Sequence, residues 1–62
     1  MTTYKIGDMV MFSTPKGSVK TGSIIDVDTR QIHDEYEDYY KITLENGKIH
    51  FVDTYHIISK IG

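Results

Sequence analysis

The chain contains no cysteine. This absence excludes disulfides, zinc sites built on thiolates, and catalysis by a thiol nucleophile. A domain of 62 residues hides only about 60% of the surface that its unfolded chain exposes, and this one has no covalent staple to compensate. Its stability must therefore come from economical packing or from oligomerisation. We expect a single domain, residues 1–62, without a cofactor.

Long apolar runs are also missing. No stretch of about 18 apolar residues, the length needed to span a membrane, occurs anywhere in the sequence. The first residues, MTTYKIGD, lack the apolar run of a signal peptide. These two absences predict a soluble cytoplasmic protein with no membrane partner.

The charge is small in total but uneven along the chain. A formal net charge of −2 argues against a strong, non-specific nucleic-acid binder. The segment from Asp26 to Asp38 holds six acids and only Arg30 as a base, whereas the remainder has six lysines and three acids. The molecule is therefore bipolar, although a charge run of this kind is usually just a solvated face.

No apolar stripe with a helical period is sustained, and β-branched and aromatic residues fall in short runs divided by turn signals. This pattern predicts an all-β protein. Gly22 interrupts the second run and predicts a bulge or sharp bend. Residues 28–38 are too polar to pack, so we expect them to form the longest connection. The expected strands are residues 8–12, 19–27, 38–45, 48–52 and 57–61.

Two short signals predict the remaining turns. Asn46-Gly47 predicts a hairpin with a type I′ turn, in which both central residues have positive φ. Asp53 can cap a single helical turn over residues 53–57.

Alternation along these strands predicts the core. The strand at 48–52 is ambiguous, because either Ile49 and Phe51 or His50 and Val52 can face inward. Outward Met9 and Met11 would leave an apolar patch, and a homodimer through that patch is the simplest form of self-association. The expected core is Val10, Phe12, Ile24, Ile25, Val27, Tyr40, Ile42, Leu44, Val52 and Ile57.

These features together resemble the SH3-like barrels of the Tudor and KOW kind, and most closely the bacterial hypervirulence-associated Tudor-like family. The second half adds an alternating strand, the Asn-Gly hairpin, Val52, and Ile57 in the terminal turn. The resemblance implies a five-stranded SH3-like barrel with a single helical turn before the last strand. The matching residues of the first half are Gly7, Asp8, Val10, Phe12, Gly22, Ile24, Ile25 and Val27.

Catalysis is not expected. The histidines, His33, His50 and His56, match no metal motif, and no glycine loop has the spacing of a phosphate cradle. A barrel of this size also lacks the volume for a closed pocket of a few hundred cubic ångströms. We therefore expect a binding module with no metal and no small-molecule substrate.

The favoured hypothesis is a protein partner or self-association. Resemblance to Tudor barrels implies that a cationic side chain is held against aromatic rings, with carboxylates nearby. The rings would be Phe51 and Tyr55 with Tyr36 or Tyr39. The candidate protein-binding residues are Tyr36, Glu37, Asp38, Tyr39, Phe51 and Tyr55.

The alternative hypothesis is nucleic-acid binding, which the KOW resemblance implies. Lysines near the first loop and across the predicted hairpin would form one basic face, and Phe51 could stack on an unpaired base. The candidate residues are Lys16, Lys20, Lys41 and Lys48.

Overall fold

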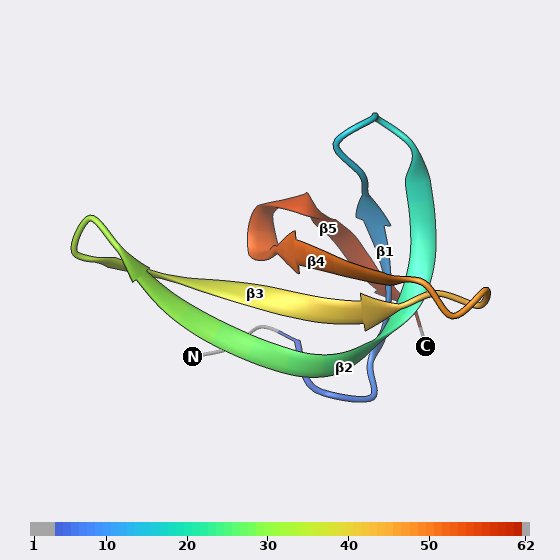
Figure 1. The fold of residues 1–62 in the computed structure, drawn as a ribbon, viewed down its shortest axis with the longest axis horizontal. Coiled ribbons are helices and arrows are strands. Elements are labelled where there is room, and N and C mark those ends of the chain that lie inside the picture. Colours follow the sequence, from blue (N-terminus) through green and yellow to red (C-terminus); the bar gives the residue numbers. More distant parts are fainter. Residues whose placement is uncertain (1–3, 62) are drawn as a thin grey trace.

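The computed structural model describes residues 4–61, so residues 1–3 and 62 of the expected domain lie outside it. Five antiparallel strands form one sheet in the order β4-β3-β2-β1-β5 (Figure 1). The sheet is open, because β4 and β5 are its two edges. The all-β prediction is confirmed. The elements are β1 (Met9–Ser13), β2 (Val19–Ile32), β3 (Glu35–Thr43), β4 (Ile49–Asp53), the 3₁₀ turn η1 (Thr54–His56) and β5 (Ile57–Ile61).

The helical turn before the last strand is confirmed together with its cap. Asp53 has an extended backbone, and its Oδ1 accepts a hydrogen bond of 3.1 Å from the backbone N–H of His56. This side chain satisfies a backbone donor that the short turn cannot satisfy by itself.

The core lies on one face of the sheet. Val27 and Leu44, both expected in the core, are partly buried against its margin. The ambiguous register of β4 is also resolved, because Val52 pairs with Tyr40 and is 7% exposed, whereas Phe51 is 69% exposed. The buried residues are Val10, Phe12, Ile24, Tyr40, Ile42, Val52 and Ile57.

Ile25 was expected in the core, and this prediction is wrong. The pairing of β2 with β3 shifts between Ile24 and Asp26, so Ile25 is the extra residue of a β-bulge and is 41% exposed. The bulge lets both Ile24 and Val27 face the core although they are three residues apart. Of the bulge or bend that we expected at Gly22, the bulge therefore lies three residues later.

Gly22 has a different role, which is to allow two strands to approach closely. It is buried opposite Val10. A Cβ at this position would lie 2.6 Å from the carbonyl oxygen of Thr43 and 2.6 Å from a methyl carbon of Ile42. Only glycine leaves room for this contact between β2 and β3.

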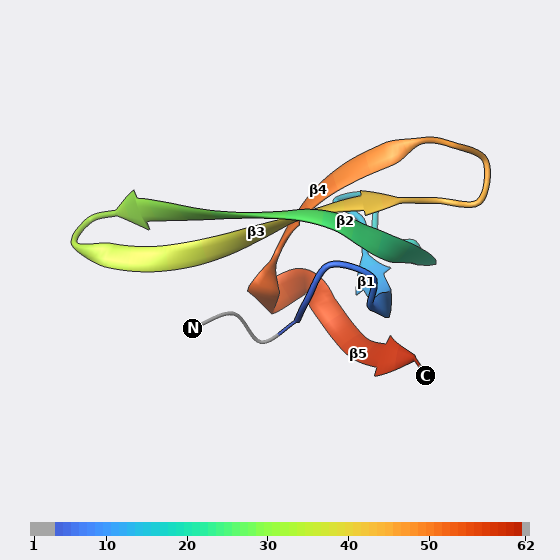
Figure 2. The ribbon, with the colours of Figure 1, turned by 90° about the horizontal axis from the view of Figure 1, so that it is seen from below.

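The prediction of a polar connection at residues 28–38 is wrong. β2 continues to Ile32 and β3 begins at Glu35, so only His33 and Asp34 lie between the strands. Both of these residues have positive φ, 50° and 66°, which defines a type I′ turn. Residues 28–38, called the ribbon below, extend as a two-stranded arm beyond the rest of the sheet (Figures 1 and 2).

The turn at Asn46-Gly47 is not of type I′, so that expectation is wrong as well. Of these two residues only Gly47 has positive φ, 83°, and its N–H donates to the carbonyl of Leu44 at 2.9 Å. This pattern is a type I turn followed by a left-handed glycine. The loop at residues 14–18 repeats it, with Gly17 at φ 87° donating to Thr14.

Asp8 makes the stability of the fold depend on pH. Its carboxylate accepts a 2.9 Å hydrogen bond from the backbone N–H of Lys5 and lies 3.6 Å from Lys60 Nζ. Mainly through the bond from Lys5, this environment holds the pKa of Asp8 below its ordinary value of 3.8. The carboxylate therefore stabilises the folded state above that ordinary value, and the contribution is lost as the pH falls through the folded-state pKa.

We expect Asp8→Asn to lower the free energy of unfolding at about pH 7, and the difference from the wild type to shrink toward about pH 2 as the wild-type carboxylate becomes protonated. Urea unfolding of both proteins across this range measures the difference. A deficit of the same size at both ends of the range would contradict the assignment.

Candidate functional site

Three of the four candidate lysines line a single groove of about 410 Å³. Lys16 comes from the 14–18 loop, Lys20 from the start of β2, and Lys48 from the turn before β4. We call this the lysine groove. Its remaining lining residues are Thr14, Pro15, Ser18, Leu44, Asn46 and His50, so no carboxylate lines it.

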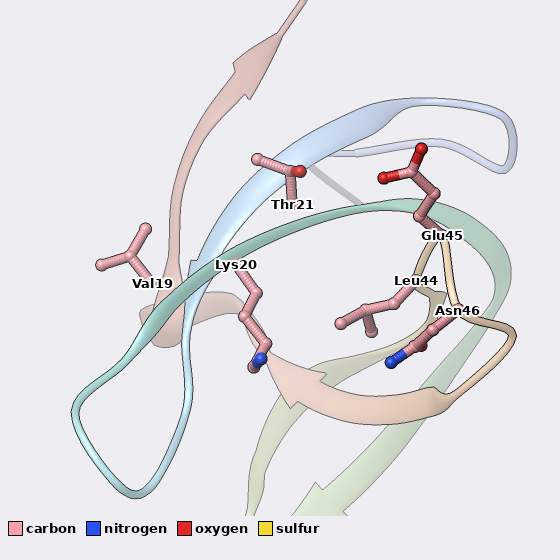
Figure 3. A pocket seen from close by; sticks show the side chains of 6 residues that line it. All are labelled: Val19, Lys20, Thr21, Leu44, Glu45 and Asn46. Atoms are coloured by element: carbon pink, nitrogen blue, oxygen red, sulfur yellow. The ribbon is translucent and has the colours of Figure 1, made fainter.

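Two similar turns build this groove from opposite sides. The 14–18 loop and the 44–48 turn have the same backbone hydrogen-bond pattern, and both contribute lining residues. Figure 3 shows an adjoining, more open hollow that shares Lys20, Leu44 and Asn46 with the groove, and these three side chains point into the space between the start of β2 and the turn. Leu44 and Pro15 provide apolar surface between the charged groups. The adjoining hollow has a volume of about 500 Å³ and is also lined by Glu45, so one carboxylate lies beside the groove although none lines it.

No lysine of the groove forms an ion pair among residues 4–61. Within residues 4–61 the ion pairs are Arg30–Asp28, His56–Asp53 and Lys60–Asp8. None of these pairs includes a groove lysine, and all three groove lysines are exposed. Their mutual repulsion is reduced when an anion lies between them, so the groove has the electrostatics of an anion-binding surface.

The groove continues toward an exposed aromatic ring. A smaller cavity of about 170 Å³ shares Thr14, Pro15 and His50 with the lysine groove and is also lined by Phe51. Lys41, the fourth candidate lysine, pairs with Phe51 on the neighbouring strand, and its Nζ lies 5.9 Å from the ring centroid. Lys41 therefore lies beside Phe51. The expectation that it lies across the turn from Lys48 is wrong.

The aromatic candidates divide between the two faces of β3. Tyr36 and Tyr39 are three residues apart in a regular strand, so their side chains point to opposite faces. Tyr39 shares its face with Lys41 and lines two hollows together with Phe51. Tyr36 is 73% exposed on the other face, and Tyr55 in η1 is 81% exposed. The structure therefore places Tyr39 near Phe51, whereas Tyr36 lies on the opposite face of the strand.

The carboxylates that were expected beside these rings have partners within the ribbon. Glu37 accepts a 3.0 Å hydrogen bond from the Tyr39 hydroxyl, which raises the pKa of Tyr39 above 10.0. Asp38 accepts one of 2.7 Å from the hydroxyl of Thr29 on the opposite face. Both carboxylates therefore stabilise the ribbon through side-chain hydrogen bonds.

Arg30 is a member of this surface that the sequence analysis missed. It lies directly opposite Glu37 in the strand register of the ribbon. Its guanidinium lies 5.0 Å from the centroid of the Tyr39 ring, and its Nε donates a hydrogen bond of 3.1 Å to Asp28. The signal that could have placed Arg30 was His33-Asp34, two residues that tolerate the positive φ of a tight hairpin turn. Reading them as a hairpin turn would have placed Arg30 opposite Glu37.

Two of the three histidines, His50 and His56, line the cavity of about 170 Å³ together with Asp53. Asp53 Oδ1 lies 2.5 Å from His56 Nδ1, a contact that the sequence did not reveal, but the same carboxylate also caps η1. His33 occupies the exposed turn of the ribbon, and His50 lies beside Phe12 with its ring centroid 5.8 Å away. Among residues 4–61, no group of three or more His, Cys, Asp or Glu side chains is arranged to hold a metal ion.

Comparison with known proteins adds no further constraint. No protein-family model matches the chain, and no curated protein or solved structure matches it. The part of the chain that the structure describes contains no helix with the length and apolar character needed to cross a membrane.

Proposed function

We propose that this chain is a non-enzymatic module that binds single-stranded nucleic acid in the lysine groove. The observation that supports this function best is the convergence of Lys16, Lys20 and Lys48, from three separate segments, on one groove that no carboxylate lines. Lysine ammonium groups are effective partners for phosphate, and their contacts supply most of the affinity of sequence-independent binding.

The neighbouring ring extends the same proposal to the bases. A strand whose phosphates lie along the lysines can continue past His50 to Phe51, which is 69% exposed and able to stack on an unpaired base. The net charge of −2 is compatible with this mode because the acids are concentrated on the ribbon. The molecule is 35 Å long, several times the distance of about 8 Å over which physiological salt screens charge.

We also infer that the open sheet is a variant of the SH3-like barrel, of the kind that the Tudor and KOW resemblance implies. The strand order β4-β3-β2-β1-β5 and the 3₁₀ turn between the last two strands support this inference. Folds of this class have many unrelated functions, so the lysine groove and not the fold carries the functional proposal.

The test is an amide NMR titration of the labelled protein with a short single-stranded oligonucleotide. With three phosphate contacts, we expect the affinity to fall about 20-fold between about 0.05 M and about 0.2 M salt. Shifts should concentrate at residues 14–20 and 44–51. Replacing Lys16, Lys20 and Lys48 together by glutamine should weaken binding at least about tenfold and remove most of the salt dependence.

Lys5→Gln is the matched control, because Lys5 is an exposed lysine in the turn at the opposite end of β1. This variant should bind like the wild type. Binding that persists in the triple glutamine variant, or no binding at low salt, would refute the proposal.

A second candidate function is contact with a protein partner through the outer face of β2, β3 and β4, as the favoured hypothesis from the sequence implies. The observation in its favour is the mixed surface of Tyr39, Phe51, Arg30 and Lys41, where two rings each carry a cation near their face. In this case an oligonucleotide would produce no amide shifts at the lysine groove. Neutralising the three groove lysines would leave the affinity for the protein partner unchanged.

A further inference from the structure

The tip of the ribbon carries negative charge that has no partner among residues 4–61. Along the ribbon, the carboxylates of Asp28, Glu37 and Asp38 each accept a hydrogen bond from a neighbouring side chain. Within residues 4–61, no ion pair or side-chain hydrogen bond involves Asp34 or Glu35. These two acids, at the outermost turn, are free to meet a cation on another molecule.

The tip is also narrow and partly apolar. A two-residue connection is among the tightest that two antiparallel strands can have, and here it consists of His33 and Asp34. Tyr36 is 73% exposed and Ile32 is 39% exposed, one on each face of the ribbon just behind the turn. The tip therefore combines acids with exposed apolar side chains.

The lysine groove has the complementary properties, because its three lysines form no ion pair within residues 4–61 and lie around Leu44 and Pro15. Its loops and the ribbon tip lie toward opposite ends of a molecule 35 Å long (Figures 1 and 2). The ribbon is part of the continuous strands β2 and β3, so it cannot fold back to its own groove. An occupant of this kind must come from another molecule.

We propose that the ribbon tip of one copy of this chain docks in the lysine groove of a second copy. Asp34 and Glu35 meet the lysines, and Tyr36 packs toward Leu44. The two surfaces differ, so the contact is heterologous and joins copies head to tail into short chains or rings. This inference goes beyond the proposed function and does not require nucleic-acid binding, although both use the same groove.

A contact made by one hairpin tip is small, which places it among weak interfaces. We expect a dissociation constant of about 0.1 to 1 mM, with at least about tenfold weakening when the salt concentration is raised to about 1 M, where charges are screened within about 3 Å.

Two variants test the two surfaces of the contact separately. The tip variant combines Asp34→Asn with Glu35→Gln, because asparagine tolerates the positive φ of position 34 and a neutral tip is not attracted to the acidic groove of the second variant. The groove variant combines Lys16→Glu, Lys20→Glu and Lys48→Glu. All five positions are exposed, and circular dichroism of each variant verifies its fold. Lys5→Glu is the control for a charge reversal outside the groove.

Each variant alone should be monomeric in sedimentation equilibrium at concentrations where the wild type and Lys5→Glu associate. An equimolar mixture should form one-to-one dimers, because one partner retains the acidic tip and the other retains the lysine groove. With label on the groove variant, amide shifts should appear at residues 31–37. With label on the tip variant, they should appear at residues 14–20 and 44–50.

Three results would overturn the inference. A wild type that remains monomeric at about 1 mM lacks the contact, given the affinity expected for an interface of this size. Variants that associate as the wild type does would place the interface elsewhere, for example at Met9, which is 47% exposed. A mixture that stays monomeric would show that the ribbon tip and the lysine groove do not bind each other. The tip variant retains the groove, so oligonucleotide binding by that variant tests the proposed function independently.

Discussion

Gly22→Ala is expected to lower the free energy of unfolding by about 3 kcal/mol or more, the upper range for overpacking a tight core. The new methyl group would lie 2.6 Å from the Thr43 carbonyl oxygen. That atom belongs to the backbone of a central strand, so it cannot move aside as a flexible side chain would. The sheet itself would have to open between β2 and β3.

A domain of 62 residues has a total stability of only about 3 to 9 kcal/mol. The alanine variant should therefore be largely unfolded at 37 °C or have a much reduced midpoint in urea. Gly47→Ala is the matched control. A Cβ added at position 47 would meet no atom within 4 Å, so only the positive φ opposes alanine there, at a cost of about 1 to 2 kcal/mol. Equal losses in the two variants would show that close approach at Gly22 is unimportant.

Phe12→Ala is expected to cost about 3 to 5 kcal/mol, as for other buried phenylalanines. The side chain of Phe12 is fully buried, and its ring lies beside that of His50. Removing it leaves a cavity in a core of few residues, which small domains cannot easily offset. Chemical unfolding measured by tyrosine fluorescence or circular dichroism gives the difference directly.

Phe51→Ala is the comparison that tests the register of the edge strand. Phe51 is 69% exposed, so its replacement should change stability by only about 0.5 kcal/mol. Under the proposed function the same variant should lose one base-stacking contact, about 1 to 3 kcal/mol of oligonucleotide affinity. A large loss of stability in Phe51→Ala would contradict the inward position of Val52.

Alternation predicted most of the core because strands with one buried face leave a clear pattern. Val10 and Phe12 in β1, and Tyr40 and Ile42 in β3, are buried as this pattern requires. It failed at Ile25, where a bulge adds a residue to one strand. Two adjacent isoleucines do not reveal which of them is the extra residue.

The ribbon was missed for a different reason. Both of its faces are largely exposed, so its residues are polar on both sides and show no alternation. Hydrogen bonds between its own strands satisfy the backbone without a buried face. Polarity was therefore interpreted as a loop, although His33 and Asp34 both tolerate the backbone of a type I′ turn.

The candidate site could be named residue by residue but not assembled from the sequence. Lys16 and Lys48 are 32 positions apart, and they meet only because two loops with the same turn geometry flank one groove. The turn signals Pro-Lys-Gly and Glu-Asn-Gly were visible. Their position relative to each other depends on the order of the strands, which local patterns do not specify.

None of the buried core residues belongs to the ribbon, and this separation has an evolutionary consequence. Adding or removing two residues in each strand would change the reach of the arm by about 7 Å and keep every side chain on its original face. A single-residue change in one strand would instead exchange the two faces. Reach can therefore diverge between descendants of this chain, in steps of two, without any repacking of the interior.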